Sequence, residues 1–135
     1  MRKIILASHS YLSKGMKYSV EKILGKQENL DFICAYVEDR DLGEEVRKKI
    51  LLRDENDEII IITDILGGSV NNELSKLLRE KNIYLVTGMN LQLVIEILIS
   101  NSQNIEELIE NAIEESKKGI IFYNKQKVQI EDEDF

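Results

Sequence analysis

Residues 58–69 have the sequence EIIIITDILGGS, in which four consecutive isoleucines lead to a threonine, an aspartate and a glycine-rich segment. A short, unbroken run of β-branched apolar residues is typical of a strand that is buried on both faces of a sheet. Asp64 follows this run directly, and Gly67-Gly68-Ser69 comes three residues later. The stretch therefore predicts a central strand with a carboxylate, a tight turn and a hydroxyl at its exit.

Apolar runs of strand length alternate along the chain with apolar residues at helical spacing. Further strands are predicted at residues 4–7, 32–37 and 83–86, and short extended segments at 120–123 and 128–130. Helices are predicted at residues 12–24, 42–50, 70–78, 91–98 and 105–118. This alternation predicts an α/β protein with a mainly parallel four-stranded sheet that is covered by helices on both faces.

Single residues mark where several of these helices begin and end. Asp41, Ser69 and Asn90 are each placed to cap a helix N-terminus, and Gly25 and Gly119 are placed to end one. The alternation alone leaves the strand order open. We predict the flavodoxin-like, doubly wound order 2-1-3-4, in which the first and third strands are neighbours and form the switch point where such sheets bind ligands.

His9, the only histidine of the chain, follows the first strand. In the order 2-1-3-4 it lies at the same edge of the sheet as Asp64. An imidazole titrates near neutrality, so a neutral ring with one nucleophilic nitrogen is available. A carboxylate at Nδ1–H would fix the tautomer and leave Nε2 free to attack. We predict that His9 and Asp64 form a catalytic pair, although a structural histidine and a turn-capping aspartate are the simpler alternatives.

The segment Gly67-Gly68-Ser69 is the predicted phosphate-binding part of this site. Glycines permit a tight turn, a helix N-terminus offers backbone N–H groups, and the Ser69 hydroxyl is a further donor. Phosphoryl transfer depends mainly on positioning and charge stabilisation, so neither a metal nor a cofactor is expected. The same three residues, taken alone, are usually only a loop.

Composition limits the classes of protein to which the chain can belong. Its 135 residues are 43% hydrophobic and 32% charged, which fits a single globular domain over residues 1–135. A net charge of −7 argues against nucleic-acid binding. One cysteine, Cys34, and one histidine leave no metal cluster. Neither a signal peptide nor a membrane span is recognisable, so a cytoplasmic protein is expected, with an acidic tail at residues 131–135.

Over about residues 2–123 the chain resembles the IIA component of the mannose-type sugar phosphotransferase system (PTS). The matching pieces are Ala7-Ser8-His9, residues 63–69 with Asn72 beyond them, and residues 87–91. The family commonly has Gly after the histidine, Pro after Gly-Gly-Ser and a further Pro near residue 92. This chain instead has Ser10, Val70 and Gln92.

The resemblance implies a phosphotransferase component that accepts a phosphoryl group from the carrier HPr on Nε2 of His9. It implies that the group passes to a IIB component, which phosphorylates sugar entering through the membrane components IIC and IID. It also implies that Asp64 holds Nδ1 and that Ser69 helps to bind the phosphoryl group. Family members are usually homodimers that exchange a C-terminal strand, for which residues 119–123 are the candidate.

Three other functions stay open at this point. The IIA-like phosphocarrier of the dihydroxyacetone kinase system shares Ser8-His9-Ser10, whereas Gly67-Gly68-Ser69 and residues 88–91 favour the sugar-transport type. A receiver domain would be phosphorylated on Asp64, but it needs carboxylates after the first strand to bind Mg²⁺. A regulatory or binding module on the same fold is also possible, because fold does not determine function.

Overall fold

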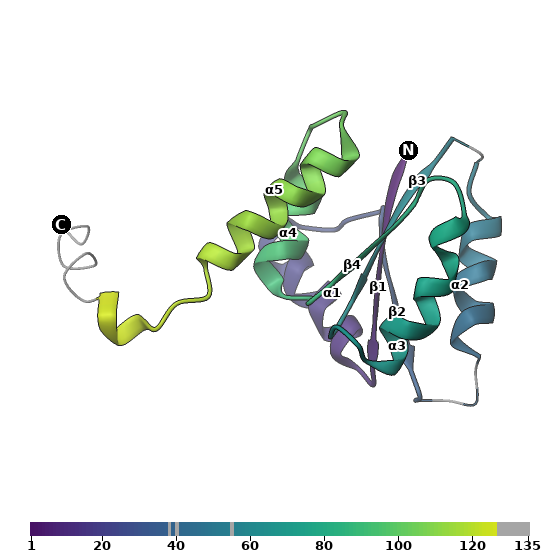
Figure 1. The fold of residues 1–135 in the computed structure, drawn as a ribbon, viewed down its shortest axis with the longest axis horizontal. Helices are drawn as coiled ribbons and strands as arrows, with labels where there is room; N and C mark the ends of the chain where they lie inside the picture. The colour runs from purple at the N-terminus through teal and green to yellow at the C-terminus, as the bar shows by residue number, and fades with distance from the viewer. Residues whose placement is uncertain (38, 40, 55, 127–135) are drawn as a thin grey trace.

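The computed structural model describes residues 1–126 except residues 38, 40 and 55. Within these residues the sheet consists of β1 (Arg2–His9), β2 (Leu30–Ala35), β3 (Glu58–Thr63) and β4 (Ile83–Thr87). All neighbouring strands are parallel, and their order is β2-β1-β3-β4. The predicted order 2-1-3-4 is therefore confirmed, with β1 and β3 side by side at the centre (Figure 1).

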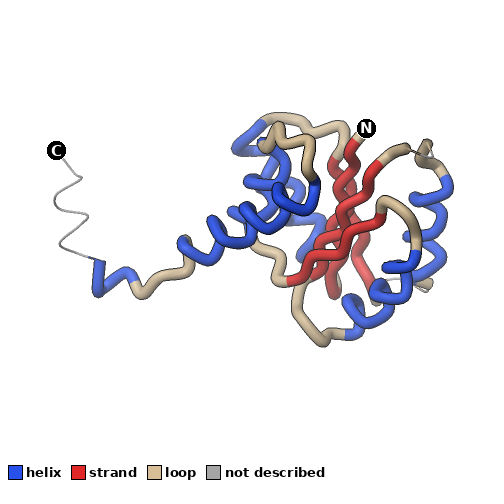
Figure 2. The backbone as a smooth tube through the Cα atoms, turned by 45° about the horizontal axis from the view of Figure 1, so that its top comes forward, coloured by secondary structure: helices blue, strands red, loops and turns tan. Residues whose placement is uncertain are grey.

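Helices cover both faces of this sheet, as predicted (Figures 1 and 2). On one face lie α1 (Leu12–Leu24), α4 (Leu91–Ile99) and α5 (Ile105–Lys118). On the other lie α2 (Leu42–Leu51) and α3 (Ser69–Leu74), and α3 continues into the 3₁₀ turn η1 (Ser75–Arg79). Among the described residues, no helix is both long enough and apolar enough to cross a bilayer.

The isoleucine run of β3 supplies both hydrophobic cores. Ile60 and Ile62 pack with α1, α4 and α5, whereas Ile59 and Ile61 pack with α2 and α3. All four side chains are fully buried. Because successive residues of a strand point to opposite faces, a central strand between two helical layers must be apolar at every position.

Most of the predicted helix ends are confirmed. The side chains of Asp41 and Asn90 each accept a hydrogen bond from the backbone N–H three residues later. The prediction that Ser69 caps a helix is wrong, because Gly68 is the N-cap of α3 and Ser69 is its first residue. The hydroxyl of Ser69 points instead toward His9.

The second strand ends earlier than the sequence indicates. It covers Leu30–Ala35 rather than residues 32–37. Tyr36 has a φ of +64°, in the left-handed region, so the chain turns away from the sheet at this residue.

Beyond α5 the chain leaves the body of the molecule (Figure 1). Residues 119–122 form no strand, and η2 (Tyr123–Gln126) is a 3₁₀ turn. The predicted extra strand is therefore absent from the described part of this single chain, in which Gly119 and Ile120 make turn hydrogen bonds to α5. Its exchange with a second copy stays a prediction. The extended segment at 128–130 and the acidic tail at 131–135 lie outside the described residues.

Candidate functional site

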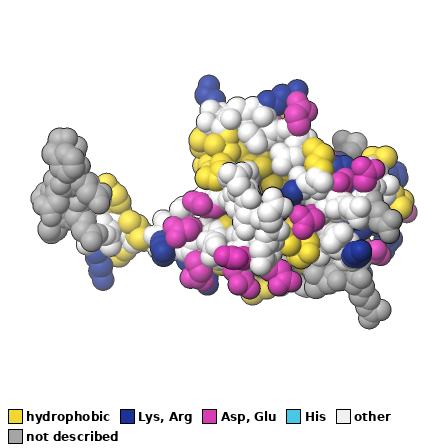
Figure 3. All heavy atoms as spheres, turned by 90° about the horizontal axis from the view of Figure 1, so that it is seen from above, with side chains coloured by type: hydrophobic (Ala, Val, Ile, Leu, Met, Phe, Trp, Pro, Cys, Tyr) yellow, Lys and Arg dark blue, Asp and Glu magenta, His cyan; other side chains and the backbone are white. Residues whose placement is uncertain are grey.

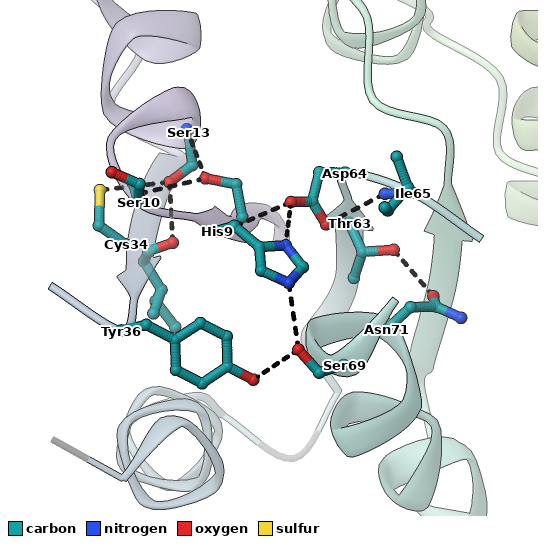
Figure 4. A network of polar contacts seen from close by, with 12 residues as sticks. His9, Ser10, Ser13, Cys34, Tyr36, Thr63, Asp64, Ile65, Ser69 and Asn71 are labelled. Carbon is teal, nitrogen blue, oxygen red and sulfur yellow. Dashed lines mark hydrogen bonds and ion pairs between the residues drawn. The ribbon is translucent and has the colours of Figure 1, made fainter. Parts of the chain in front are cut away.

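The carboxyl ends of β1 and β3 bring His9 and Asp64 into contact. Ala7 pairs with Thr63 in the sheet. His9 comes two residues after Ala7, and Asp64 comes directly after Thr63. Both the backbone N–H of His9 and its ring Nδ1 contact Oδ2 of Asp64, at 2.8 and 2.6 Å (Figure 4). The two residues that the sequence placed at one edge of the sheet are thus hydrogen-bonded to each other.

The environment of Asp64 keeps its carboxyl group ionised. Burial raises the pKa of this carboxyl, but hydrogen bonds from the backbone and ring of His9 and from the backbone N–H of Ile65 lower it. The net effect is a pKa below the ordinary value of 3.8. An ionised carboxylate can only accept hydrogen bonds, so Nδ1 of His9 carries a hydrogen, and in the neutral ring Nε2 then carries the lone pair.

The free nitrogen of His9 faces a hydroxyl. Ser69 Oγ lies 3.1 Å from Nε2, and the hydroxyl of Tyr36 donates to Ser69 Oγ at 2.9 Å. Because Ser69 accepts from Tyr36, its own hydrogen is free to point at the lone pair of Nε2. The side chain of His9 is 41% exposed and that of Asp64 8% exposed, so Asp64 anchors an imidazole that a partner can reach.

Sequence reasoning missed Tyr36. It lies one residue beyond β2, whose last residue, Ala35, pairs with His9 in the sheet. That register places Tyr36 at the same edge, but it depends on where β2 ends. Two sequence neighbours of His9 have other surroundings, because Tyr11 is exposed and the Lys14 ammonium lies over the ring of Tyr18.

The glycine segment places Ser69 beside the ring. Gly67 has a φ of +76°, and its carbonyl accepts a hydrogen bond from the side-chain amide of Asn72 at 3.2 Å. A methyl group on Gly68 would lie 3.4 Å from Cε1 of His9 and only 2.9 Å from the side chain of Ile65. The backbone N–H of Gly68 already donates to the carbonyl of Ile65 at 3.3 Å. These glycines shape the turn, and their contact with a phosphoryl group stays a prediction.

We expect Gly67→Ala to lower the free energy of unfolding by roughly 1–2 kcal/mol, because a side chain is unfavourable at this positive φ. Gly15→Ala is the matched control. Gly15 lies inside α1 with open space around it, so an added methyl group should stabilise the helix by about 0.5–1 kcal/mol. Urea unfolding of both variants measures the two effects, and equal shifts would contradict the assigned strain.

Hydrogen bonds behind the site hold the two helices that lie next to it. The buried hydroxyl of Ser8 accepts from the backbone N–H of Ser13 at 2.7 Å, which anchors the start of α1 next to His9. Thr63 donates to the side chain of Asn71 at 2.8 Å, which links β3 to α3. The two helices next to the site, α1 and α3, are therefore tied to the central strands. No group of three potential metal-binding side chains gathers anywhere in the described part of the chain.

A comparison with known proteins identifies the family. Residues 3–113 match the family model EIIA-man, whose description is PTS system fructose IIA component. The chain belongs to the EIIA-man family. The resemblance to mannose-type PTS IIA components is thereby confirmed. Membership argues against a receiver domain, as does the geometry, because both oxygens of Asp64 already accept hydrogen bonds.

Solved structures share this fold across most of their length. A Klebsiella pneumoniae protein described as a phosphoenolpyruvate-dependent sugar PTS permease is 42% identical, with 93% of each chain covered and a TM-score of 0.87. The PTS component EIIA of Streptococcus agalactiae is 26% identical, with 93% of this EIIA-man chain and 99% of that chain covered and a TM-score of 0.81.

Curated relatives are longer proteins. The mannose-specific EIIAB component of the PTS in Escherichia coli K12 is 24% identical over 123 residues, which is 87% of this chain and 38% of that protein. The chain therefore spans well under half the length of this relative, and only the shared part bears on its function.

Proposed function

We propose that this EIIA-man protein is a phosphocarrier that accepts a phosphoryl group from HPr on Nε2 of His9 and passes it to a IIB component. One observation carries the proposal. Nδ1 of His9 is held at 2.6 Å by an ionised carboxylate, while Nε2 is accessible and faces a hydroxyl donor. This arrangement favours Nε2 rather than Nδ1 as the nucleophile.

In the accepting step, the lone pair of Nε2 forms a bond to phosphorus as the bond between phosphorus and the donor breaks. The donor keeps the electron pair of the broken bond. Nδ1 keeps its hydrogen, so the ring becomes positively charged, and the carboxylate of Asp64 offsets that charge. Transfer to the IIB component reverses these changes and returns the ring to its neutral form.

The Ser69 hydroxyl is placed to donate a hydrogen bond to a phosphoryl group on Nε2. It occupies part of the space beside Nε2 that a bonded phosphoryl group would fill. We infer that it moves aside and donates its hydrogen to a phosphoryl oxygen. Phosphoryl transfer of this kind relies on positioned donors and charges rather than on covalent chemistry by further groups.

The wider pathway follows from the family. The IIB component would phosphorylate sugar that enters through membrane components IIC and IID, with which this chain has only an indirect connection. The same proposal places the chain in the cytoplasm with HPr. The identity of the sugar depends on those other components.

Reconstitution tests the proposal. The purified chain is mixed with enzyme I, HPr and phosphoenolpyruvate, and the modified residue is mapped at neutral or basic pH, because phosphohistidine is acid-labile and base-stable. We expect the label on His9 and its discharge by a IIB component. A label on Asp64 would overturn the proposed role of His9, and discharge only by a dihydroxyacetone kinase system would overturn the sugar-transport assignment.

We also propose that the protein is a homodimer in which residues 119–123 contact a second copy. Ile120, Ile121, Phe122 and Tyr123 are consecutive and all exposed. Figure 3 shows hydrophobic side chains on the narrow part of the molecule that extends from its main body. Consecutive exposed hydrophobic residues of this kind usually mark a surface that a partner covers.

A chain that ends at residue 118 should therefore dimerise much more weakly than the full chain. A chain that ends at residue 126 is the control, because it keeps the four hydrophobic residues and lacks only residues 127–135. Sedimentation over a range of concentrations measures the dissociation constants. Unchanged affinity in the shorter chain would refute the role of residues 119–123.

A further inference from the structure

Tyr36 has an unfavourable backbone conformation that packing in the core does not explain. Its φ of +64° lies in the left-handed region, which a bulky side chain rarely adopts. The residue is 62% exposed, so burial in a hydrophobic core does not hold it there. Strained backbone positions of this kind concentrate at functional sites, where the geometry they produce is needed.

The left-handed turn directs the Tyr36 side chain to the site (Figure 4). Its ring centroid lies 5.4 Å from that of His9, with the two planes tilted by 48°. Its hydroxyl donates to Ser69 Oγ at 2.9 Å. These two contacts of the exposed side chain are made with the His9 ring and with the hydroxyl that lies beside Nε2.

The hydrogen bond from Tyr36 determines what Ser69 can do. A hydroxyl that already accepts a hydrogen bond directs its single hydrogen elsewhere, here toward Nε2. Accepting one hydrogen bond also strengthens a hydroxyl as a donor to the next partner in the chain. Asp64 controls only the Nδ1 side of the ring, so it does not replace this effect.

We propose that Tyr36 is a positioning residue for phosphoryl transfer at His9, an inference that rests on the proposed function. Tyr36 orients and polarises the Ser69 hydroxyl, so that this hydroxyl donates to Nε2 in the free protein. The same hydroxyl donates to a phosphoryl oxygen during transfer. Tyr36 does not contact the phosphorus and acts through Ser69.

The test compares Tyr36→Phe with Tyr11→Phe in the full chain. Tyr36→Phe removes the hydroxyl and keeps the ring beside His9. Tyr11 is a matched control because, like Tyr36, it is an exposed tyrosine. It lies at the start of α1. We expect Tyr36→Phe to slow labelling by HPr about three- to tenfold, the range for loss of one hydrogen bond, and Tyr11→Phe to leave the rate unchanged.

Two further readouts separate positioning from a merely structural role. In a Ser69→Ala background, Tyr36→Phe should have no further effect, because the residue through which it acts is gone. His9 is the only histidine, so its ring ¹⁵N resonances are identified without ambiguity. Tyr36→Phe should shift the Nε2 resonance while Nδ1 stays protonated.

The outcomes distinguish the inference from the proposed function. Labelling of the natural chain on His9 with an unchanged rate and Nε2 resonance in Tyr36→Phe overturns the role of Tyr36 and leaves the phosphocarrier intact. An equal slowing by Tyr36→Phe with and without Ser69 also overturns it, because Tyr36 would then act by another route. Absence of label on His9 in the natural chain overturns both.

Discussion

His9→Ala should abolish labelling of this protein by phosphoenolpyruvate, enzyme I and HPr, since the chain has no second imidazole to replace the nucleophile. The fold should persist, because the ring lies at the exposed end of β1 and contributes nothing to either hydrophobic core. Loss of its hydrogen bond to Asp64 should cost about 1 kcal/mol of unfolding free energy. Filter-bound radiolabel and urea unfolding measure the two effects.

His9→Asn is the companion variant. Its side-chain amide can donate to Asp64 in place of Nδ1–H, so the buried carboxylate keeps a partner while the nucleophile is absent. Both variants should be unlabelled, and His9→Asn should be the more stable of the two. Labelling at the natural rate in either one would end the assignment of His9.

The sequence was sufficient for the central architecture because burial leaves a clear pattern there. Four isoleucines in succession are typical of a strand that is covered on both faces, and the alternation with helical segments predicts a parallel sheet. The positions of His9 and Asp64 follow from that order, because the ends of adjacent parallel strands meet at one edge.

The parts that sequence reasoning missed depend on local backbone geometry. Tyr36 contacts the site because its own backbone adopts a left-handed φ, and a tyrosine in the sequence does not predict that conformation. Ser69 was assigned as a cap because serine is common at that position, but its hydroxyl binds His9 instead. Residues 119–123 form no strand alone, since a strand needs a neighbour and none of the described residues of this single chain pairs with them.

The structure shows the local environment of two residues, Ser10 and Val70, that differ from the family pattern. Ser10 has a φ of +52°, the left-handed region in which glycine is unstrained, so the glycine common in the family fits this backbone better than serine does. Val70 is fully buried against the core on the α2 and α3 face. Its side chain supplies packing at the start of α3, where a proline would instead fix the backbone.

Asp64→Asn should slow phosphoryl transfer by about 10²- to 10⁴-fold, because it removes the charge that offsets the phosphorylated ring. The amide fits in only two ways. With its oxygen toward His9, the ring tautomer is kept but the NH₂ group faces the backbone N–H of Ile65. With its NH₂ toward His9, it meets the backbone N–H and favours the tautomer with hydrogen on Nε2, which blocks the nucleophile.

Asp64→Ala is the less informative change. It removes not only the charge but also the acceptor of hydrogen bonds from the backbone N–H groups of His9 and Ile65. Leaving these donors without a partner should cost about 1–3 kcal/mol each. The asparagine variant keeps at least part of these hydrogen bonds. It therefore distinguishes the effect of the charge of Asp64 from the effect of its hydrogen bonds to the backbone.

Asp57→Asn is the matched control for Asp64→Asn. Asp57 is also a buried aspartate whose pKa is lowered, chiefly by a hydrogen bond from the N-terminal amino group at 3.0 Å, with which it also forms an ion pair. It precedes β3, at the opposite end of that strand from Asp64. Asp57→Asn should therefore lower stability and leave the labelling rate of His9 unchanged, because stability lost at that end does not alter the ring tautomer.

Rapid-quench labelling by HPr gives the rates, and ¹⁵N spectra of the single imidazole give the tautomer. If Asp64→Asn slows transfer with Nδ1 still protonated, the charge of Asp64 is its main contribution. If transfer is slowed and the hydrogen is found on Nε2, control of the ring tautomer is the main contribution of Asp64. An unchanged rate would remove Asp64 from the mechanism, because the 2.6 Å contact would then have no chemical consequence.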